Sequence, residues 1–231
     1  MRQRAALASG DFQPAERRRL RMSPPGMSEE LENFAARVRG CRICVENPVG
    51  QPLPHEPRPV LRPSSSARIL IASQAPGTKV HMSGMPFTDA SGDRLRSWLG
   101  VSSEEFYDTT KFAIVPMGFC FPGQDAKGGD LPPRRECAPA WRAPLIALMP
   151  RIDLVLTIGS YAQSWHMGAA RRPSLTETVM DWRAIWDAPS SPKVLPLPHP
   201  SWRNTGWLKR NPWFEMDLLP FLRAEIRYRL G

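Results

Sequence analysis

Four cysteines are the residues of this chain best suited to hold an inorganic group. They form a C-x2-C pair and, after 75 further residues, a C-x16-C pair: Cys41, Cys44, Cys120 and Cys137. Thiolates bind zinc and iron–sulfur clusters, and four of them complete either site. The spacing predicts such a site, although four unrelated buried thiols would also fit it, and it does not choose between zinc and [4Fe-4S]. Because no secretory signal precedes them, we do not expect structural disulfides.

A histidine is the second candidate for chemistry. Residues 193–197 predict a strand, and His199 follows it in a Pro-His-Pro-Ser turn. The imidazole would then lie at the carboxyl edge of a sheet, where a neutral ring can donate a hydrogen bond to a developing anion. A lone histidine is also often an ordinary surface or core residue, and this alternative stays open.

Aromatic and basic residues are interleaved in the segment that follows, residues 198–213. The segment contains three tryptophans among basic and amide side chains: Trp202, Arg203, Asn204, Trp207, Lys209, Arg210, Asn211 and Trp213. This composition fits phosphate contacts together with stacking or wedging of bases. A loop that packs between helices, with a solvated polar face, is the alternative.

The loop after the first predicted strand, residues 69–72, is the first place to look for a ligand site. In open α/β sheets, ligands bind where loops leave the carboxyl ends of strands. Residues 74–87 offer an amide at Gln74, an aromatic ring at Phe87 and free backbone N–H groups, but no carboxylate before Asp89. The chain has no GxGxxG, P-loop, GxSxG or HExxH motif, which argues against dinucleotide, nucleoside triphosphate, acyl-transfer and metalloprotease chemistry.

Short apolar runs alternate with helical patterns along the chain. We expect strands at residues 69–72, 112–115, 153–158 and 193–197, and helices at 28–40, 92–100, from 102, 134–149, 159–168, 173–182 and 211–229. This alternation predicts a three-layer α/β/α sandwich with a mostly parallel central sheet of about four strands. The long Gly/Pro segment 116–133 is expected to be functional, because loops of this length rarely persist otherwise.

The composition favours a polyanionic partner. The 231 residues carry a formal net charge of +9, although an arginine-rich soluble protein without such a partner would show the same excess. Residues 1–27 are basic and have no apolar signal region, so we expect a disordered arm there and one domain over residues 28–231. No apolar run approaches ~18 residues, so we expect no membrane span and a cytoplasmic protein.

Taken in order, these motifs resemble the uracil-DNA glycosylase superfamily, most closely its bacterial and archaeal iron–sulfur branch (families four and five). SQAPG after the first strand is similar to the GEAPG of that branch, and eight residues then lead to Pro86 and Phe87. The cysteines follow the cluster spacing of that branch, and HPS resembles the motif after its final strand. The resemblance extends from about Cys41 to the C-terminal helix and implies the uracil-DNA glycosylase fold.

The resemblance also implies a role for each motif. The four cysteines would hold a structural [4Fe-4S] cluster, with zinc as the alternative. Phe87 would stack on a base flipped out of DNA, Gln74 would line the pocket, and His199 would bond to O2 of uracil and stabilise the departing base. The other implied residues line the base pocket or contact DNA: Ala75, Pro76 and Gly77 the pocket, and Ser201, Trp202, Arg203 and Asn204 the DNA.

The implied activity is that of a monofunctional, monomeric DNA glycosylase that removes uracil or a related deaminated base near the bacterial nucleoid. The chain departs from the family at Gln74, where the branch has Glu, and at Ala75, where other members carry an activating aspartate. An amide cannot act as a general base, and residues 115–119 lack the uracil-reading Asn. Two hypotheses follow: a slow or narrow glycosylase, and a catalytically weak or inactive DNA-binding member. A zinc-stabilised nucleotide hydrolase is a third, weaker one.

Overall fold

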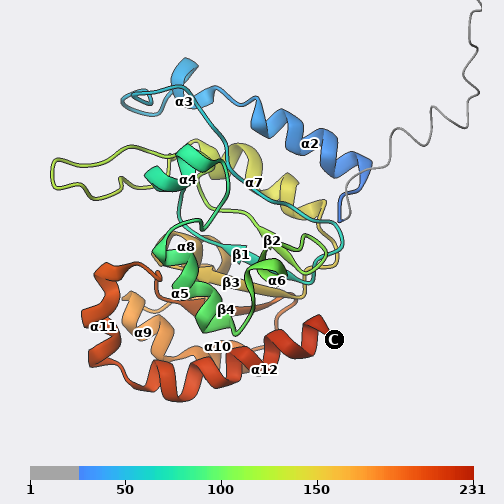
Figure 1. Ribbon diagram of the computed structural model, residues 1–231, viewed down its shortest axis with the longest axis vertical. Helices are drawn as coiled ribbons and strands as arrows, with labels where there is room; N and C mark the ends of the chain where they lie inside the picture. Colours follow the sequence, from blue (N-terminus) through green and yellow to red (C-terminus); the bar gives the residue numbers. More distant parts are fainter. Residues whose placement is uncertain (1–25) are drawn as a thin grey trace, which may run out of the picture.

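The computed structural model describes residues 26–231, and Figure 1 shows how their elements are arranged. Of the disordered arm expected over residues 1–27, residues 1–25 lie outside this range. The carbonyl oxygen of Gly26 accepts a hydrogen bond from the backbone N–H of Ser65 at 2.8 Å. No helix among the described residues is long and apolar enough to cross a membrane.

Four parallel strands form the central sheet, as the sequence predicted. Their order is β2-β1-β3-β4, and their bounds are β1 Ile69–Ala72, β2 Phe112–Ile114, β3 Leu154–Ile158 and β4 Lys193–Leu197. Ile69 of β1 pairs with Phe112 on one side and with Leu154 on the other. The chain therefore leaves β1 first toward one edge and later toward the other, which makes the carboxyl end of β1 a topological switch point.

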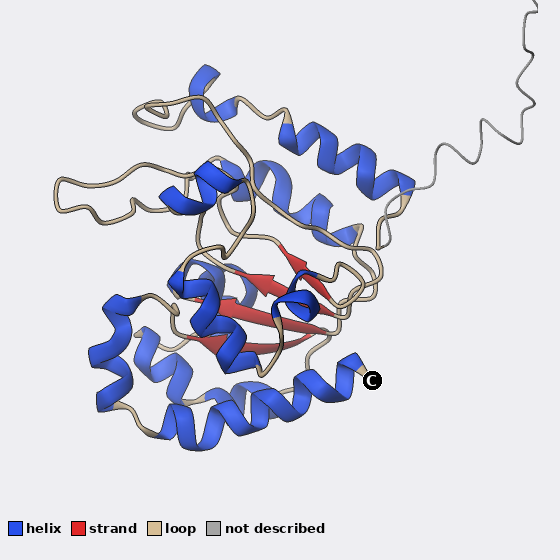
Figure 2. Ribbon diagram, in the orientation of Figure 1, coloured by secondary structure: helices blue, strands red, loops and turns tan. Residues whose placement is uncertain are grey.

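Helices cover both faces of the sheet (Figure 2). One layer contains α2 (Glu29–Arg39), α7 (Cys137–Ala147) and α8 (Ser160–Met167). The other contains α5 (Ala90–Leu99), α6 (Ser103–Tyr107), α9 (Leu175–Met180), α10 (Trp182–Asp187) and α12 (Leu219–Leu230). Alternate side chains of β1 enter opposite layers: Ile69 and Ile71 one, Leu70 and Ala72 the other. Burial on both faces explains why β1 is apolar throughout, and the predicted α/β/α architecture is confirmed.

Helix starts follow the capping residues that the sequence indicated. The Ser28 side chain accepts from the N–H of Leu31 at 3.2 Å and begins α2. Ser102 and Glu105 form a reciprocal capping box before α6. Each cap satisfies backbone N–H groups that have no partner inside the helix, so these two boundaries could be read from local chemistry.

The structure corrects the prediction of one C-terminal helix over residues 211–229. A separate helix α11 (Thr205–Arg210) comes first, then a π-helical turn, η3 (Phe214–Leu218), and then α12. Residues before a proline disfavour helical geometry, so α11 ends ahead of Pro212. Pro220 has no N–H to continue the hydrogen-bond ladder, which accounts for the irregular turn before it. The short helices α3 (Ile43–Glu46) and α4 (Thr78–Ser83) were also not predicted.

Candidate active site

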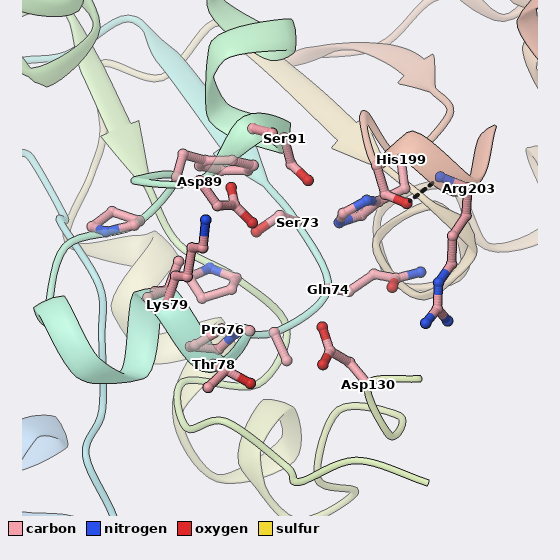
Figure 3. Close-up of a pocket in the computed structure, with 18 of the residues that line it drawn as sticks. Ser73, Gln74, Pro76, Thr78, Lys79, Asp89, Ser91, Asp130, His199 and Arg203 are labelled. Carbon is pink, nitrogen blue, oxygen red and sulfur yellow. Dashed lines mark hydrogen bonds between the residues drawn. The ribbon is translucent and has the colours of Figure 1, made fainter. Parts of the chain in front are cut away.

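A pocket of about 590 Å³ opens at the carboxyl edge of the sheet, beyond the ends of β1 and β4 (Figure 3). Its volume lies within the range of about 300–1,000 Å³ that is typical of ligand sites. All ten residues that the sequence assigned to a base pocket or to DNA contact line this one pocket: Gln74, Ala75, Pro76, Gly77, Phe87, His199, Ser201, Trp202, Arg203 and Asn204. The fold thus brings together segments more than a hundred residues apart.

The turn after β1 is held by backbone hydrogen bonds. The carbonyl of Ser73 accepts from the N–H of Met117 at 2.8 Å, and the carbonyl of Gln74 accepts from the N–H of Gly118 at 2.9 Å. The Gln74 side chain lies over Gly159, where a Cβ would stand 2.7 Å from Nε2. The amide of Gln74 has no hydrogen bond to another residue in the described part of the chain, so its donor and acceptor are available to a ligand.

Phe87 is held in a strained backbone conformation. Its φ of 58° is the left-handed region, which a bulky residue adopts only when its surroundings enforce it. The Phe87 carbonyl accepts from the Tyr107 hydroxyl at 3.0 Å and from the Arg96 guanidinium at 3.2 Å. The buried ring packs edge-to-face on Phe106, with 5.9 Å between ring centroids. Several contacts therefore fix the aromatic wall of the pocket.

His199 provides a neutral imidazole. Asn204 Nδ2 donates to the carbonyl oxygen of His199 at 2.7 Å, which ties the turn together. Burial lowers the pKa of His199 below its ordinary 6.5, and the carboxylates of Asp89 and Asp130 oppose that shift. Since burial dominates, the ring is uncharged at neutral pH and can donate one N–H to an acceptor in the pocket.

Two carboxylates line the pocket that the sequence analysis had not assigned to it, Asp89 and Asp130. Asp89 is the N-cap of α5, and its Oδ1 accepts from the N–H of Gly92 at 3.2 Å. Asp130 belongs to the long loop 116–133, which the sequence marked as functional without indicating a residue. Such a loop has no periodicity from which the direction of one side chain could be inferred.

The rim of the pocket carries one exposed tryptophan. Trp202 lies in the 3-10 turn η2 (Trp202–Asn204) and is 73% exposed. The Arg203 guanidinium lies 5.7 Å from the centre of the Trp202 ring and donates to the carbonyl of Gly128 at 3.0 Å. The exposed ring of Trp202 is thus available to stack on a base.

The other two tryptophans of the segment 198–213 are packing residues. The rings of Trp207 and Trp213 meet at 5.8 Å, and both lie edge-on to Phe214. The indole N–H of Trp207 donates to the hydroxyl of Thr176 at 2.8 Å. The packing alternative therefore holds for Trp207 and Trp213, whereas DNA contact by Trp202 stays a prediction.

The four cysteines are free thiols; Cys137 lies in the core layer of α2 and α7, and Cys44 packs with Cys120 in a separate small cluster. Burial, with a smaller contribution from the other cysteines, raises the pKa of Cys120 and of Cys137 to about 12. The indole N–H of Trp141 donates to Cys41 Sγ at 3.2 Å, and the N–H of Phe119 donates to Cys137 Sγ at 3.3 Å. Two of the four thiols therefore receive N–H donors, the kind of contact that also tunes the sulfur ligands of iron–sulfur clusters.

A metal centre requires its ligands close together: four thiolates around one zinc ion stand about 3.8 Å apart, because each Zn–S bond is about 2.3 Å in a tetrahedral site. Among residues 26–231, no three His, Cys, Asp or Glu side chains form a group that could hold a metal ion. The [4Fe-4S] cluster and its alternative, zinc, both stay predictions from the sequence.

A buried arginine supports the start of the loop 116–133. Arg142 is fully buried and donates to the carbonyls of Val115 and Pro116 at 3.1 and 2.8 Å. Its remaining terminal nitrogen lies 2.7 Å from Nε2 of His166. Burial and the charge of Arg142 lower the pKa of His166 to about 3, so the imidazole is neutral and accepts from the guanidinium. This pair fixes Pro116, which lines the pocket.

A family model described as the uracil DNA glycosylase superfamily matches residues 61–223. The match covers more than half of the chain, so this protein belongs to the uracil DNA glycosylase superfamily. Membership points to DNA glycosylase chemistry and to DNA as the partner. The matched residues include all ten predicted pocket and rim residues together with Cys120 and Cys137, whereas Cys41 and Cys44 precede them.

Proposed function

We propose that this protein is a monofunctional DNA glycosylase that hydrolyses the N-glycosidic bond of uracil or a related deaminated base flipped out of DNA. The observation that carries the proposal is the convergence of Gln74, Phe87 and His199 on one pocket, with Trp202 exposed at its rim. These groups supply an amide, an aromatic wall, a neutral donor and a side chain that can fill the vacated base stack.

Base recognition follows from the walls of the pocket. A base is accessible to such a site only after extrusion from the helix, which costs a few kcal/mol. Stacking on the Phe87 ring and wedging of Trp202 into the gap offset that cost. The Gln74 amide, which carries both a donor and an acceptor, can pair with the N–H and C=O groups of a cyclic imide such as uracil.

Departure of the base requires stabilisation of an anion. When the C1′–N bond breaks, its electron pair stays on the base, and negative charge develops on the oxygen atoms of uracil. His199, held neutral by burial, donates a hydrogen bond to that charge. A hydrogen-bond donor that the fold already holds in position lowers the reaction barrier most when it points to the atom where charge develops in the transition state. Lys79 lines the pocket, but none of the residues assigned to base recognition or departure is a lysine. We therefore propose hydrolysis without a Schiff base, which leaves an intact strand with an abasic site.

The four cysteines are proposed to hold a [4Fe-4S] cluster that orders the loop 116–133. Cys120 lies within this loop, and Cys137 follows it at the start of α7. The bound cluster would supply cross-linking between distant segments rather than reaction chemistry. Purified protein should then be brown, with iron and acid-labile sulfide in equal amounts. A colourless preparation that contains zinc would overturn the cluster assignment.

A single-stranded oligonucleotide with one uracil tests the catalytic proposal. Treatment with the protein and then with hot alkali should break the strand at the uracil, whereas omission of the alkali should leave it intact. Oligonucleotides that carry hypoxanthine or xanthine define the base preference. If no deaminated base is released while the oligonucleotide is still bound, the alternative of a DNA-binding member without catalysis is correct. The missing carboxylate at Gln74 and Ala75 is the observation that favours this alternative.

A further inference from the structure

The loop 116–133 places the carboxylate of Asp130 against the turn after β1, which has no carboxylate of its own at Gln74 or Ala75. Asp130 Oδ2 lies 3.1 Å from the position that a Cβ on Gly77 would occupy. Figure 3 shows the Asp130 carboxylate on the same side of the pocket as the Gln74 amide. Gln124 Nε2 donates to Asp130 Oδ1 at 3.3 Å. Oδ2 has no hydrogen-bond partner among the described residues, so one oxygen is held and the other is free to act.

The backbone around Asp130 is fixed by a local hairpin. An antiparallel bridge joins Gln124 to Asp130, and the N–H of Leu131 donates to the carbonyl of Gly123 at 2.9 Å. At the tip, Asp125 Oδ1 accepts from the N–H groups of Lys127 and Gly129, both at 2.8 Å. The backbone at Asp130 is therefore held by a hydrogen-bonded hairpin, although the Asp130 side chain is exposed.

The hairpin is tied to the opposite rim of the pocket. Arg203 donates to the carbonyl of Gly128 at 3.0 Å, and Arg203 belongs to the same turn as Trp202. The carboxylate of Asp130 partly opposes the lowering of the His199 pKa by burial. The leaving-group donor and the carboxylate both line this pocket.

The second carboxylate of the pocket, Asp89, has a different task. Its Oδ1 caps α5, and it lies on the wall next to Phe87, where the base would stack. Asp130 lies beside Gly77 and on the same side of the pocket as the Gln74 amide (Figure 3). Of the two carboxylates, Asp130 is therefore the one that adjoins Gly77 and Gln74, where the missing carboxylate would be.

We infer that Asp130 is the catalytic carboxylate of this enzyme, supplied by the loop 116–133 in place of the residue that Gln74 and Ala75 do not provide. This inference rests on the proposed glycosylase function. The C1′–N bond breaks and its electron pair leaves with the base, so positive charge develops on the sugar. The charge of Asp130 stabilises that cation and orients a water molecule.

The remaining steps balance with water as the only co-reactant. The water oxygen forms a bond to C1′, and its proton passes to Asp130 Oδ2 and then to solvent. The base anion takes up a proton from solvent. One water is consumed, and the products are the free base and a sugar with a hydroxyl at C1′. General-base catalysis of this kind contributes about 10²–10⁴-fold to a rate.

The decisive experiment compares Asp130→Asn with the wild type in single-turnover release of uracil from a single-stranded oligonucleotide. Asp187→Asn, at an exposed position outside the pocket, is the matched control for loss of one negative charge. Binding is measured with an oligonucleotide that carries 2′-fluorodeoxyuridine. Its fluorine destabilises positive charge on the sugar, so the glycosidic bond resists hydrolysis. Thermal unfolding shows whether each variant is folded.

We expect Asp130→Asn to lower the single-turnover rate by about 10²–10⁴-fold, with analogue binding equal to or tighter than that of the wild type. Asp130→Glu should recover part of the rate, and Asp187→Asn should match the wild type. An active wild type with an Asp130→Asn variant within threefold of its rate would overturn this inference alone. A wild type that releases no base would overturn the proposed function and this inference with it.

Discussion

The carbonyl oxygen of Phe87 lies 1.8 Å from the point where a Cβ at position 92 would stand. Gly92, in the first turn of α5, is therefore the residue that allows the strained Phe87 backbone to approach the helix. The aromatic wall of the pocket therefore depends on the absence of a side chain at Gly92 as much as on Phe87 itself.

Gly92→Ala should therefore damage both stability and activity. The added methyl group must displace the Phe87 carbonyl from the Tyr107 and Arg96 donors. Overpacking of this kind costs about 1–3 kcal/mol, and we expect that loss in the free energy of unfolding measured by urea titration. Base release should fall as well, because the Phe87 ring moves with its backbone.

Gly206→Ala is the matched control, because Gly206 also lies in a helix. Its nearest contact would be Arg210 at an ordinary 3.6 Å. Alanine is favoured over glycine in a helix by about 0.5–1 kcal/mol, so this variant should be slightly more stable than the wild type. Equal stabilities of the two variants would contradict the steric account.

Trp202→Ala should weaken DNA binding without affecting the fold. Loss of one stacking aromatic costs about 1–3 kcal/mol, which corresponds to roughly 5–150-fold in the dissociation constant. Because the side chain is 73% exposed, the melting temperature should not change. Fluorescence anisotropy with a labelled oligonucleotide measures the effect. Trp165→Ala, another exposed tryptophan outside the pocket, should bind as the wild type does; equal losses in both would refute a specific role for Trp202.

His199→Ala should lower the rate of base release by about 10²–10³-fold, the usual effect of removing one donor to a developing anion. Burial lowers the pKa of His199 below its ordinary 6.5. Protonation of the ring should therefore remove its contribution to the single-turnover rate only at a lower pH than for an exposed imidazole. His199→Gln, which keeps an N–H donor but does not titrate, should recover part of the rate; full activity of the alanine variant would exclude this role.

The Arg142–His166 pair makes stability depend on pH. The folded pKa of His166 is about 3, below the ordinary 6.5, so below pH 6.5 the unfolded chain binds a proton that the folded chain does not. The free energy of unfolding should fall by up to about 1.4 kcal/mol per pH unit as the pH drops from 6.5 toward 3. Above pH 6.5 this group contributes no pH dependence.

His166→Gln isolates that effect, because its Oε1 can accept from Arg142 but cannot be protonated in this range. Urea unfolding of both proteins at pH 7.5, 6 and 5 should show the stability of the wild type falling faster than that of the variant. Parallel curves for the two proteins would show that His166 does not titrate as proposed. Other acid-sensitive groups act equally in both and cancel in the comparison.

Local chemistry in the sequence was sufficient for most of the framework. Strands β1, β2 and β3 are short apolar runs buried on both faces, and β4 is buried over its last three residues. Ser28 and Ser102 mark the starts of helices, because their side chains cap the first turn. Gln74 and His199 could be placed in one site because both follow strands, and the carboxyl ends of parallel strands share an edge. In these cases neighbours along the chain determine the outcome.

The parts that could not be predicted depend on contacts between distant segments. Asp130 faces Gly77 because a hairpin of irregular backbone is tied to Arg203, and no residue pattern encodes that contact. From its sequence context alone, Arg142 would be assigned to the exposed face of a helix. It is instead fully buried, because backbone carbonyls and His166 provide partners for its guanidinium. The tryptophans at 202 and 207 have similar neighbours in sequence, and only packing of helix α11 distinguishes them.

Two consecutive peptide groups connect the cysteine cluster to the pocket. The N–H of Gly118 is bonded to the carbonyl of Gln74, and the next N–H, that of Phe119, is bonded to the sulfur of Cys137. A displacement of that sulfur therefore reaches the turn after β1 through a single Cα atom. If the proposed cluster forms on Cys137, its insertion would also fix the position of Gln74, so that assembly of the metal centre and shaping of the pocket would be one event.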